Sequence, residues 1–146
     1  MNQSQPHFTS MGQVFTTVGQ LISTNRLRFG PDTPCMDIAY ELLSSHLSGG
    51  PVLAADGKFL GFVSEFDLLK ALDISKDLKT VTAQEIMSKD HLRIQDTTPI
   101  KEAVRLMEEN HWLNLCIEDK GIVTKTYTRH DLLRGYIGVD FGIDEE

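Results

Sequence analysis

Two pairs of side chains combine a hydroxyl with a carboxylate three residues later: Ser64 with Asp67, and Thr128 with Asp131. Each pair stands where a short apolar run gives way to a helical pattern, as at a strand-to-helix junction. A helix N-terminus attracts phosphate, and a carboxylate there can accept hydrogen bonds from ribose hydroxyls. The same spacing is also typical of a helix-capping box. The two pairs therefore predict either two helix caps or a nucleotide site.

The charges around the two pairs differ. Lys125, Arg129 and His130 surround the second pair, whereas the first pair has Glu65 beside it and no nearby arginine. Arginine presents a planar fork of donors to phosphate, and an additional carboxylate repels that anion. We therefore expect the stronger anion site around Asp131. The alternative is that Arg129 is a surface residue on a solvated helix turn.

The chain of 146 residues contains an internal repeat. A shift of 65 residues superimposes Ser23 on Ser88, and farther along a shift of 64 residues superimposes Asp67 on Asp131. A single-residue deletion between the two registers accounts for the change. Because a unit of about 60 residues buries too little surface to be stable alone, the two copies are expected to pack together.

Each copy contains the same order of predicted elements. A Thr-Pro pair, Thr33-Pro34 or Thr98-Pro99, precedes a segment with apolar residues at helical spacing, as expected for an N-cap and a first helical residue. Two apolar runs around a turn then predict a β-hairpin, and a second helix follows. The sequence therefore predicts an α/β (α+β) protein of two β-α-β-β-α repeats, packed sheet to sheet with pseudo-two-fold symmetry.

With this organisation the chain resembles a tandem pair of cystathionine β-synthase (CBS) domains, the Bateman module. The resemblance covers about Thr17 to Ile137. It predicts a flexible N-terminus over residues 1–13, a first repeat with its lead-in helix over 14–75, a second repeat over 76–138 and an acidic tail over 139–146. The segments that carry the resemblance are residues 17–23, 46–53, 56–69, 96–107 and 128–133.

The resemblance implies a regulatory module that is not an enzyme. Its ligand would be an adenine nucleotide or a related adenosyl compound (AMP, ADP, ATP, S-adenosylmethionine or NAD), bound in the cleft between the repeats. The implied main site consists of Thr17, Ile22, Leu47, Ser48, Thr126, Thr128, Arg129 and Asp131. A second, weaker site would use Ser64, Asp67, Thr82 and Trp112. Trp112 either stacks on a base there or belongs to the core.

Two other functions stay open. One is a ligand-free dimerisation or assembly module, since such pairs commonly form flat homodimers through their helices; a protein partner, of unknown identity, is expected in either case. The other is a small nucleotide enzyme, but the sequence has no Gly-rich phosphate loop, no G-x-G-x-x-G and no H-E-x-x-H. Its five histidines and two cysteines show no metal-ligand spacing, so we expect no metal site and no required cofactor.

The composition limits the partners and the compartment. A net charge of −7 gives no general attraction for nucleic acid or for an anionic membrane surface. No apolar run approaches the ~20 residues that span a bilayer. Cys35 and Cys116 each stand in an apolar stretch, as buried free thiols do, and residues 1–8 lack the order of a secretory signal. These features predict a cytoplasmic protein.

Overall fold

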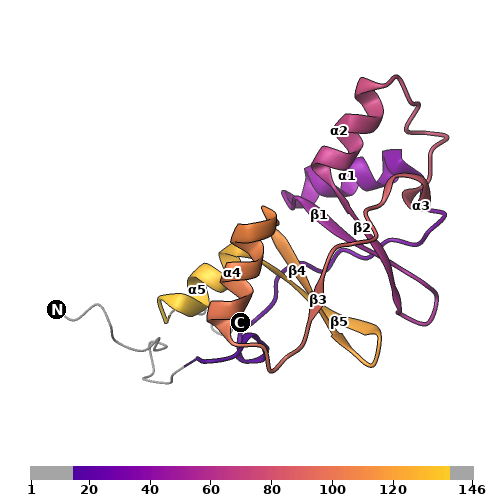
Figure 1. Ribbon diagram of the computed structural model, residues 1–146. Coiled ribbons are helices and arrows are strands. Elements are labelled where there is room, and N and C mark those ends of the chain that lie inside the picture. The colour runs from indigo at the N-terminus through magenta and orange to yellow at the C-terminus, as the bar shows by residue number, and fades with distance from the viewer. Residues whose placement is uncertain (1–14, 139–146) are drawn as a thin grey trace.

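The computed structural model describes residues 15–138, which form two α/β units placed side by side (Figure 1). The predicted flexible N-terminus at residues 1–13 and the acidic tail at residues 139–146 lie outside the described residues. The elements in chain order are the 3-10 turn η1 (Val18–Gln20), α1 (Cys35–Ser45), β1 (Gly49–Leu53), β2 (Phe59–Ser64), α2 (Glu65–Asp73), α3 (Ala83–Ile86), β3 (Arg93–Ile94), α4 (Ile100–Asn110), β4 (Asn114–Asp119), β5 (Ile122–Thr128) and α5 (Arg129–Tyr136).

Both units contain the predicted helix–hairpin–helix order, and the α+β fold is confirmed. In the second unit, β3 pairs in parallel with β4, and β4 pairs antiparallel with β5. The first unit has the antiparallel pair β1–β2, and a single parallel bridge from Phe29 to Val52 takes the place of the third strand. The two sheets are therefore versions of one topology that differ in the length of the first strand.

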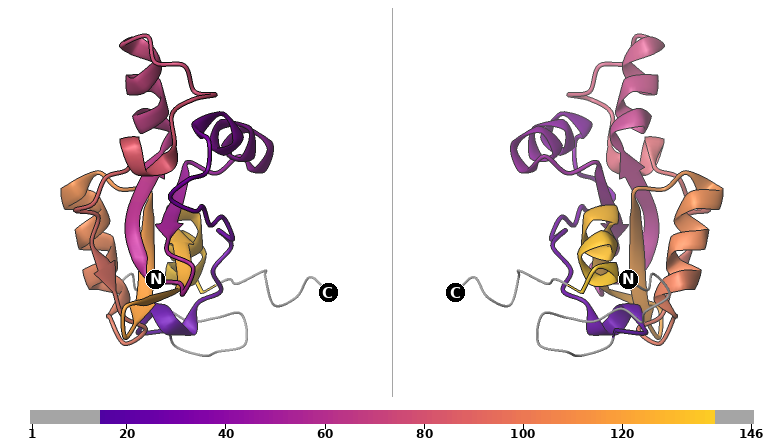
Figure 2. Two further views of the ribbon diagram at one scale, coloured as in Figure 1. Left: turned by 90° about the vertical axis from the view of Figure 1, so that its right-hand side faces the viewer. Right: turned by 90° about the vertical axis from the view of Figure 1, so that its left-hand side faces the viewer.

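The hairpins of the two units lie against one another, with helices on the outside (Figure 2). Lys58 and Ile122 form a bridge between the hairpin ends, and Asn25 forms another with Thr126. A small apolar cluster between the sheets consists of Leu53, Phe62, Cys116 and Val123. The predicted packing of sheet against sheet thus provides a shared core.

The lead-in segments cross over between the units. In η1, Val18 N–H donates to the carbonyl of Thr98 (2.9 Å), so the first lead-in packs in the core of the second unit. Conversely, Ala83 N–H in α3 donates to the carbonyl of Thr33 (2.9 Å) in the first unit. The predicted boundaries at 14–75 and 76–138 follow the sequence repeat. In the structure, each hydrophobic core combines the helices and strands of one repeat with the lead-in segment of the other repeat.

Gly19 lies at a close backbone approach within this crossover. A Cβ atom at this position would lie 2.8 Å from the carbonyl oxygen of Asp96, and real Cβ atoms do not come this close. Its own N–H donates to that carbonyl at 2.9 Å. The absent side chain therefore allows the lead-in backbone to pair with the second unit.

The two cysteines are free and buried, as predicted. Cys35 lies in the core of the first unit and Cys116 in the cluster between the sheets. Burial raises the pKa of the Cys35 thiol to about 11 and that of Cys116 to about 12. Both side chains therefore stay protonated at neutral pH and act as small apolar groups.

Candidate functional site

Two pockets open where the units meet, one at the start of each second helix. The α5 pocket has a volume of about 390 Å³, and the α2 pocket has about 480 Å³. Ser48 and Leu113 line both, so the pockets are neighbours across the pseudo-two-fold axis. The α5 pocket is lined by Thr24, His46, Leu47, Ser48, Leu113, Thr128, Arg129, His130 and Arg134.

A buried chain of amides separates the two pockets. The side chain of Asn25 donates to the carbonyl of Gly49 (2.8 Å) and to Oδ1 of Asn114 (2.9 Å). Asn114 in turn donates to the hydroxyl of Ser48 at 2.8 Å. Because buried amides that are fully paired hold a unique arrangement, this chain fixes Ser48 between the pockets.

Left-handed helix ends bring the first helices of both units to the pocket mouths. α1 ends at His46 with φ 60°, and α4 ends at the equivalent His111 with φ 57°. This turn reverses the chain direction and leads at once into β1 or β4. As a result, residues 46–48 line the α5 pocket and residues 111–114 line the α2 pocket.

Both hydroxyl–carboxylate pairs form helix-capping boxes. Asp67 N–H donates to Ser64 Oγ (3.2 Å), and Ser64 N–H donates to Asp67 Oδ2 (2.8 Å). The corresponding distances at Thr128 and Asp131 are 3.1 and 2.9 Å. The helix caps that the sequence offered as the alternative to a nucleotide site are therefore present at both positions. Any ligand would bind at helices that are already capped.

The Asp131 carboxylate is occupied by the protein itself. Its side chain is completely buried. Besides Thr128, its oxygens accept hydrogen bonds from Thr24 N–H (3.1 Å), from the Thr24 hydroxyl (2.8 Å) and from Arg134 Nη2 (2.5 Å). Asp131 therefore lies beneath the α5 pocket, and a ribose could reach it only by displacing Thr24 or Arg134.

Asp67 differs from its counterpart in accessibility. Its side chain is 16% exposed and lines the α2 pocket. Oδ2 accepts from the Ser64 amide and hydroxyl, whereas the closest cation to Oδ1 is Lys70 Nζ at 4.0 Å. Among residues 15–138, none donates a hydrogen bond to Oδ1, which leaves this oxygen able to accept from a ligand hydroxyl.

The two pockets have different charges. His46, Arg129, His130 and Arg134 line the α5 pocket, and no acidic side chain of the described chain joins them at its surface. The α2 pocket contains both Glu65 and Asp67 beside Lys70 and two histidines. The expected asymmetry between the sites is therefore present in the lining side chains.

The α2 pocket contains a stack of three rings. The imidazole of His91 lies between Phe62 (centroids 4.3 Å apart, 13° between planes) and Trp112 (4.2 Å, 21°). His91 is only 5% exposed, and this burial lowers its pKa to about 4. The imidazole is therefore neutral at physiological pH. Trp112 stacks on a side chain of the protein while it also packs against the second core.

The structure assembles part of the predicted main site. Leu47, Ser48, Thr128 and Arg129 line the α5 pocket together. The other four predicted residues do not line it: Thr17 bridges to Pro99 in the crossover, Ile22 follows η1, Thr126 is buried beside Cys116, and Asp131 lies beneath.

Three of the four residues predicted for the second site come together. Ser64, Asp67 and Trp112 line the α2 pocket, whereas Thr82 caps α3 through Glu85 (2.7 Å) and does not line it. Sequence reasoning missed Thr24, His46 and Arg134 at one pocket and Phe62, Ser88 and His91 at the other. Of these residues, only Arg134 could have been found from local spacing, since it follows Asp131 by three residues, or about one helical turn.

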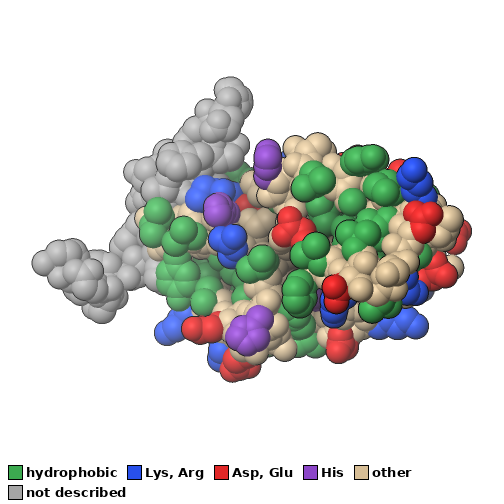
Figure 3. Space-filling model, turned by 90° about the horizontal axis from the view of Figure 1, so that it is seen from above, with side chains coloured by type: hydrophobic (Ala, Val, Ile, Leu, Met, Phe, Trp, Pro, Cys, Tyr) green, Lys and Arg blue, Asp and Glu red, His purple; other side chains and the backbone are tan. Residues whose placement is uncertain are grey.

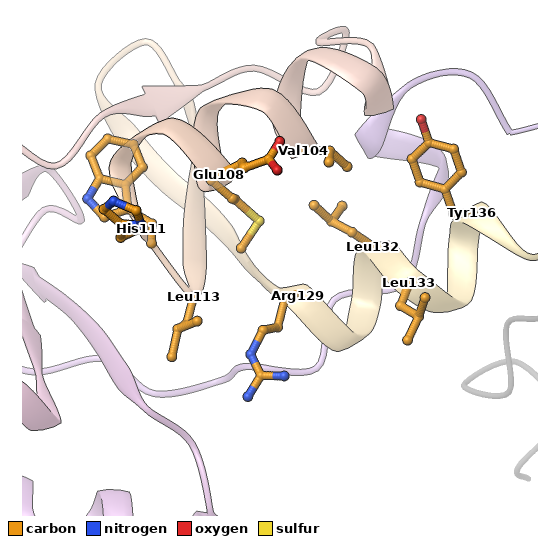
Figure 4. A pocket seen from close by; sticks show the side chains of 10 residues that line it. Val104, Glu108, His111, Leu113, Arg129, Leu132, Leu133 and Tyr136 are labelled. Carbon is orange, nitrogen blue, oxygen red and sulfur yellow. The ribbon is translucent and has the colours of Figure 1, made fainter.

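A third hollow, the α4–α5 groove, runs between the two helices of the second unit and has a volume of about 610 Å³ (Figure 4). Val104 on α4 and Leu132 on α5 point toward one another across it, and Tyr136 stands at one end (Figure 4). Arg129 and Leu113 line both this groove and the α5 pocket. The groove and the pocket therefore share a wall.

Two kinds of feature are absent from residues 15–138. No group of three or more His, Cys, Asp or Glu side chains in this range could hold a metal ion. Nor does this range contain a helix with the length and hydropathy to cross a membrane.

The family model of the CBS domain matches the chain twice, over residues 18–74 and 83–138. The chain belongs to the CBS-domain family. Each match contains one hydroxyl–carboxylate pair, so the two pockets lie at equivalent positions of the two CBS domains.

The curated relatives are longer than this chain. An uncharacterized protein of Methanocaldococcus jannaschii is 28% identical over 104 residues, which cover 70% of this chain and 25% of that protein. An uncharacterized protein of Methanopyrus kandleri is 23% identical over 120 residues, which cover 81% and 61%. The chain thus spans about a quarter and about three fifths of the relatives it matches.

Solved CBS-domain structures have the same fold. The crystal structure of CBSX2 in complex with AMP is 25% identical, with a TM-score of 0.70, and the match covers 82% of this chain and 95% of that one. A CBS domain protein from Pyrobaculum aerophilum complexed with AMP is 20% identical, with a TM-score of 0.71 and coverage of 79% and 88%. Adenine nucleotide binding therefore occurs on this fold.

Proposed function

We propose that the chain is a non-catalytic regulatory module that binds a phosphorylated adenine nucleotide in the α5 pocket. The observation that carries the proposal is the lining of this pocket, where Arg129, Arg134 and two histidines surround the N-terminus of α5. Guanidinium groups bind phosphate through charge-assisted, bidentate hydrogen bonds. The AMP complexes of CBSX2 and of the Pyrobaculum aerophilum protein support an adenine ligand on this fold.

The same lining favours some adenine compounds over others. No acidic side chain among residues 15–138 lines the pocket, and the Asp131 carboxylate beneath it is buried and paired with Arg134, so the surface that meets a ligand carries net positive charge. AMP, ADP, ATP and NAD carry anionic phosphate, whereas S-adenosylmethionine carries a sulfonium cation. Like charges repel in a partly desolvated pocket. S-adenosylmethionine should therefore bind more weakly than AMP at this site.

Arg129→Gln tests the proposal. Titration calorimetry on the nucleotide-stripped chain should show AMP binding that weakens by roughly tenfold or more in this variant, because a charged hydrogen bond to phosphate is lost. Arg105→Gln is the matched control, since Arg105 pairs with Glu102 and Glu109 on α4 and does not line the pocket. AMP affinity that is unaffected by Arg129→Gln, or absent from the unsubstituted chain, would contradict the proposal.

A second candidate, assembly through the helices, is favoured by a specific observation. Large apolar side chains are exposed on α1 and α2, and hydrophobic side chains recur across the face seen from above (Figure 3). Exposed apolar patches of this kind mark interaction sites. We propose that a second copy of the chain covers this face, so that the module is a homodimer. The apolar residues are Tyr40, Leu43, Phe66, Leu69 and Leu72, together with Ile74 directly after α2.

A further inference from the structure

A fourth hollow, the α1 pocket, lies between α1 and the lead-in segment at residues 26–29. Its volume is about 350 Å³, which is within the range of small-molecule sites. None of its lining residues also lines the α5 pocket, the α2 pocket or the α4–α5 groove. It is therefore separate from the two pockets at the starts of the second helices.

Four charged side chains line the α1 pocket, two of each sign. Arg26 and Arg28 come from the lead-in segment, and Asp37 and Glu41 come from α1. The two carboxylates are four residues apart, so they lie on one face of the helix, where like charges repel. α1 contains no lysine or arginine that would relieve this repulsion. Within residues 15–138, neither carboxylate forms an ion pair with a cation of the protein.

The second unit shows how the same helix is neutralised from within. In the register of 65 residues, Asp37 corresponds to Glu102, and Tyr40 corresponds to Arg105. Arg105 forms ion pairs with Glu102 and with Glu109, the latter at 2.6 Å. Because a tyrosine replaces this arginine in α1, the acidic face of the first unit lacks the cation that its counterpart has.

The arginines of the two lead-ins differ in the same way. Arg28 corresponds to Arg93, whose Nε pairs with Glu118 Oε1 at 3.2 Å. Arg28 instead donates to the backbone carbonyls of Val123 (3.2 Å) and Thr124 (3.3 Å). These bonds hold the guanidinium in place, and no carboxylate among residues 15–138 pairs with it. The α1 pocket therefore keeps charges of both signs that the protein itself does not match.

We propose that the α1 pocket binds a free α-amino acid with an apolar side chain. The exposed guanidinium of Arg26 would bind the α-carboxylate through charge-assisted hydrogen bonds, and Asp37 and Glu41 would bind the α-ammonium group. Leu27 and Phe29 supply the apolar part of the wall. A ligand with a single charge would match only half of the pocket. The inference goes beyond the proposed function, because both the pocket and the ligand class differ from those of the nucleotide.

Three ligands that differ by one charged group test this proposal. They are L-leucine, L-leucinamide, which lacks the carboxylate, and isocaproate, which lacks the ammonium group. Titration with L-leucine should shift the amide NMR resonances of residues 26–41. Each of the other two compounds should bind roughly tenfold or more weakly, since one charge-assisted interaction is lost. Resonances that stay in place with L-leucine, or an affinity for either analogue equal to that for L-leucine, would overturn the proposal.

Two variants test the residues. Arg26→Gln and Asp37→Asn should each weaken L-leucine binding by roughly tenfold or more, because each removes one charge that meets the ligand. Glu102→Gln is the matched control, since Glu102 is the equivalent of Asp37 and pairs with Arg105, and it should leave the affinity unchanged. Full affinity in both pocket variants would overturn the proposal. Saturating AMP should not displace L-leucine; displacement would place the amino acid in the α5 pocket and overturn the proposal as well.

Discussion

The equivalent carboxylates Asp67 and Asp131 should differ in how much each stabilises the fold. Asp131 is completely buried among Thr24, Thr128 and Arg134, whereas within residues 15–138 Asp67 makes only its capping box and a distant contact with Lys70. Removing one partner of a buried ion pair costs about 3–5 kcal/mol, whereas losing a cap costs about 1 kcal/mol. Asp131→Ala should therefore lower the free energy of unfolding by about 3 kcal/mol, and Asp67→Ala by about 1 kcal/mol.

Urea unfolding of both variants measures this difference. Equal losses would mean that the network around Asp131 contributes no more than a helix cap. The same comparison bears on the ligand site, because a loss of nucleotide binding in Asp131→Ala would follow from movement of Thr24 and Arg134 even if the carboxylate never touches the ligand. Arg129→Gln is therefore the more direct test of binding.

His91 should make stability depend on pH. Its pKa is about 4 in the folded chain and about 6.5 when unfolded, so the unfolded chain binds the proton first as pH falls. Stability is complete above pH 6.5 and is lost as the pH drops from 6.5 toward 4. Between pH 7.5 and 5 the loss should be about 2 kcal/mol. Urea unfolding of His91→Phe at both pH values supplies the control, and a difference between the two proteins that does not change with pH would refute the assignment.

At the scale of elements, the sequence predicted what its local pattern encodes. Helical spacing and hairpin turns appear twice, so α1, α4 and both hairpins could be predicted from either copy. The crossover could not be predicted in this way, because Val18 and Ala83 are apolar residues that would fit either core. Long-range contacts, such as those of Val18 with Thr98 and of Gly19 with Asp96, show which core receives the first lead-in.

The site was predictable to the same degree. The capped helix starts follow from Ser64 and Thr128, but which residues face them depends on how the two units meet. Thr24 reaches Asp131 across 107 positions of sequence, and His91 meets Trp112 only because the connection before β3 passes the end of α4. Neither contact has a local spacing that would reveal it. Contacts between the two units therefore determine which residues line the pockets, whereas the periodicity of the sequence determines the helices and strands.

At the scale of the whole molecule, Arg129 forms a wall that the α5 pocket shares with the α4–α5 groove. Its side chain lines the α5 pocket and the α4–α5 groove, so a nucleotide that engages Arg129 changes one wall of a helical surface. A ligand shifts an equilibrium between two states only by its difference in affinity for them. The proposed dimer face lies on α1 and α2, so a nucleotide at Arg129 would shift assembly only where a partner also contacts the α4–α5 groove.

The homodimer itself can be tested on the α1–α2 face. Leu43 is 68% exposed and Leu69 is 57% exposed, and a stable dimer buries about 800 Å² on each partner. Leu43→Lys combined with Leu69→Lys should give a monomer by light scattering at micromolar concentration, because two ammonium groups would be desolvated in the interface. Leu92→Lys is the matched control, since Leu92 is also exposed (45%) but lies outside the helices. The double variant should keep its AMP affinity if the α5 pocket is complete within one chain, and a dimer that survives both charges would place the interface elsewhere.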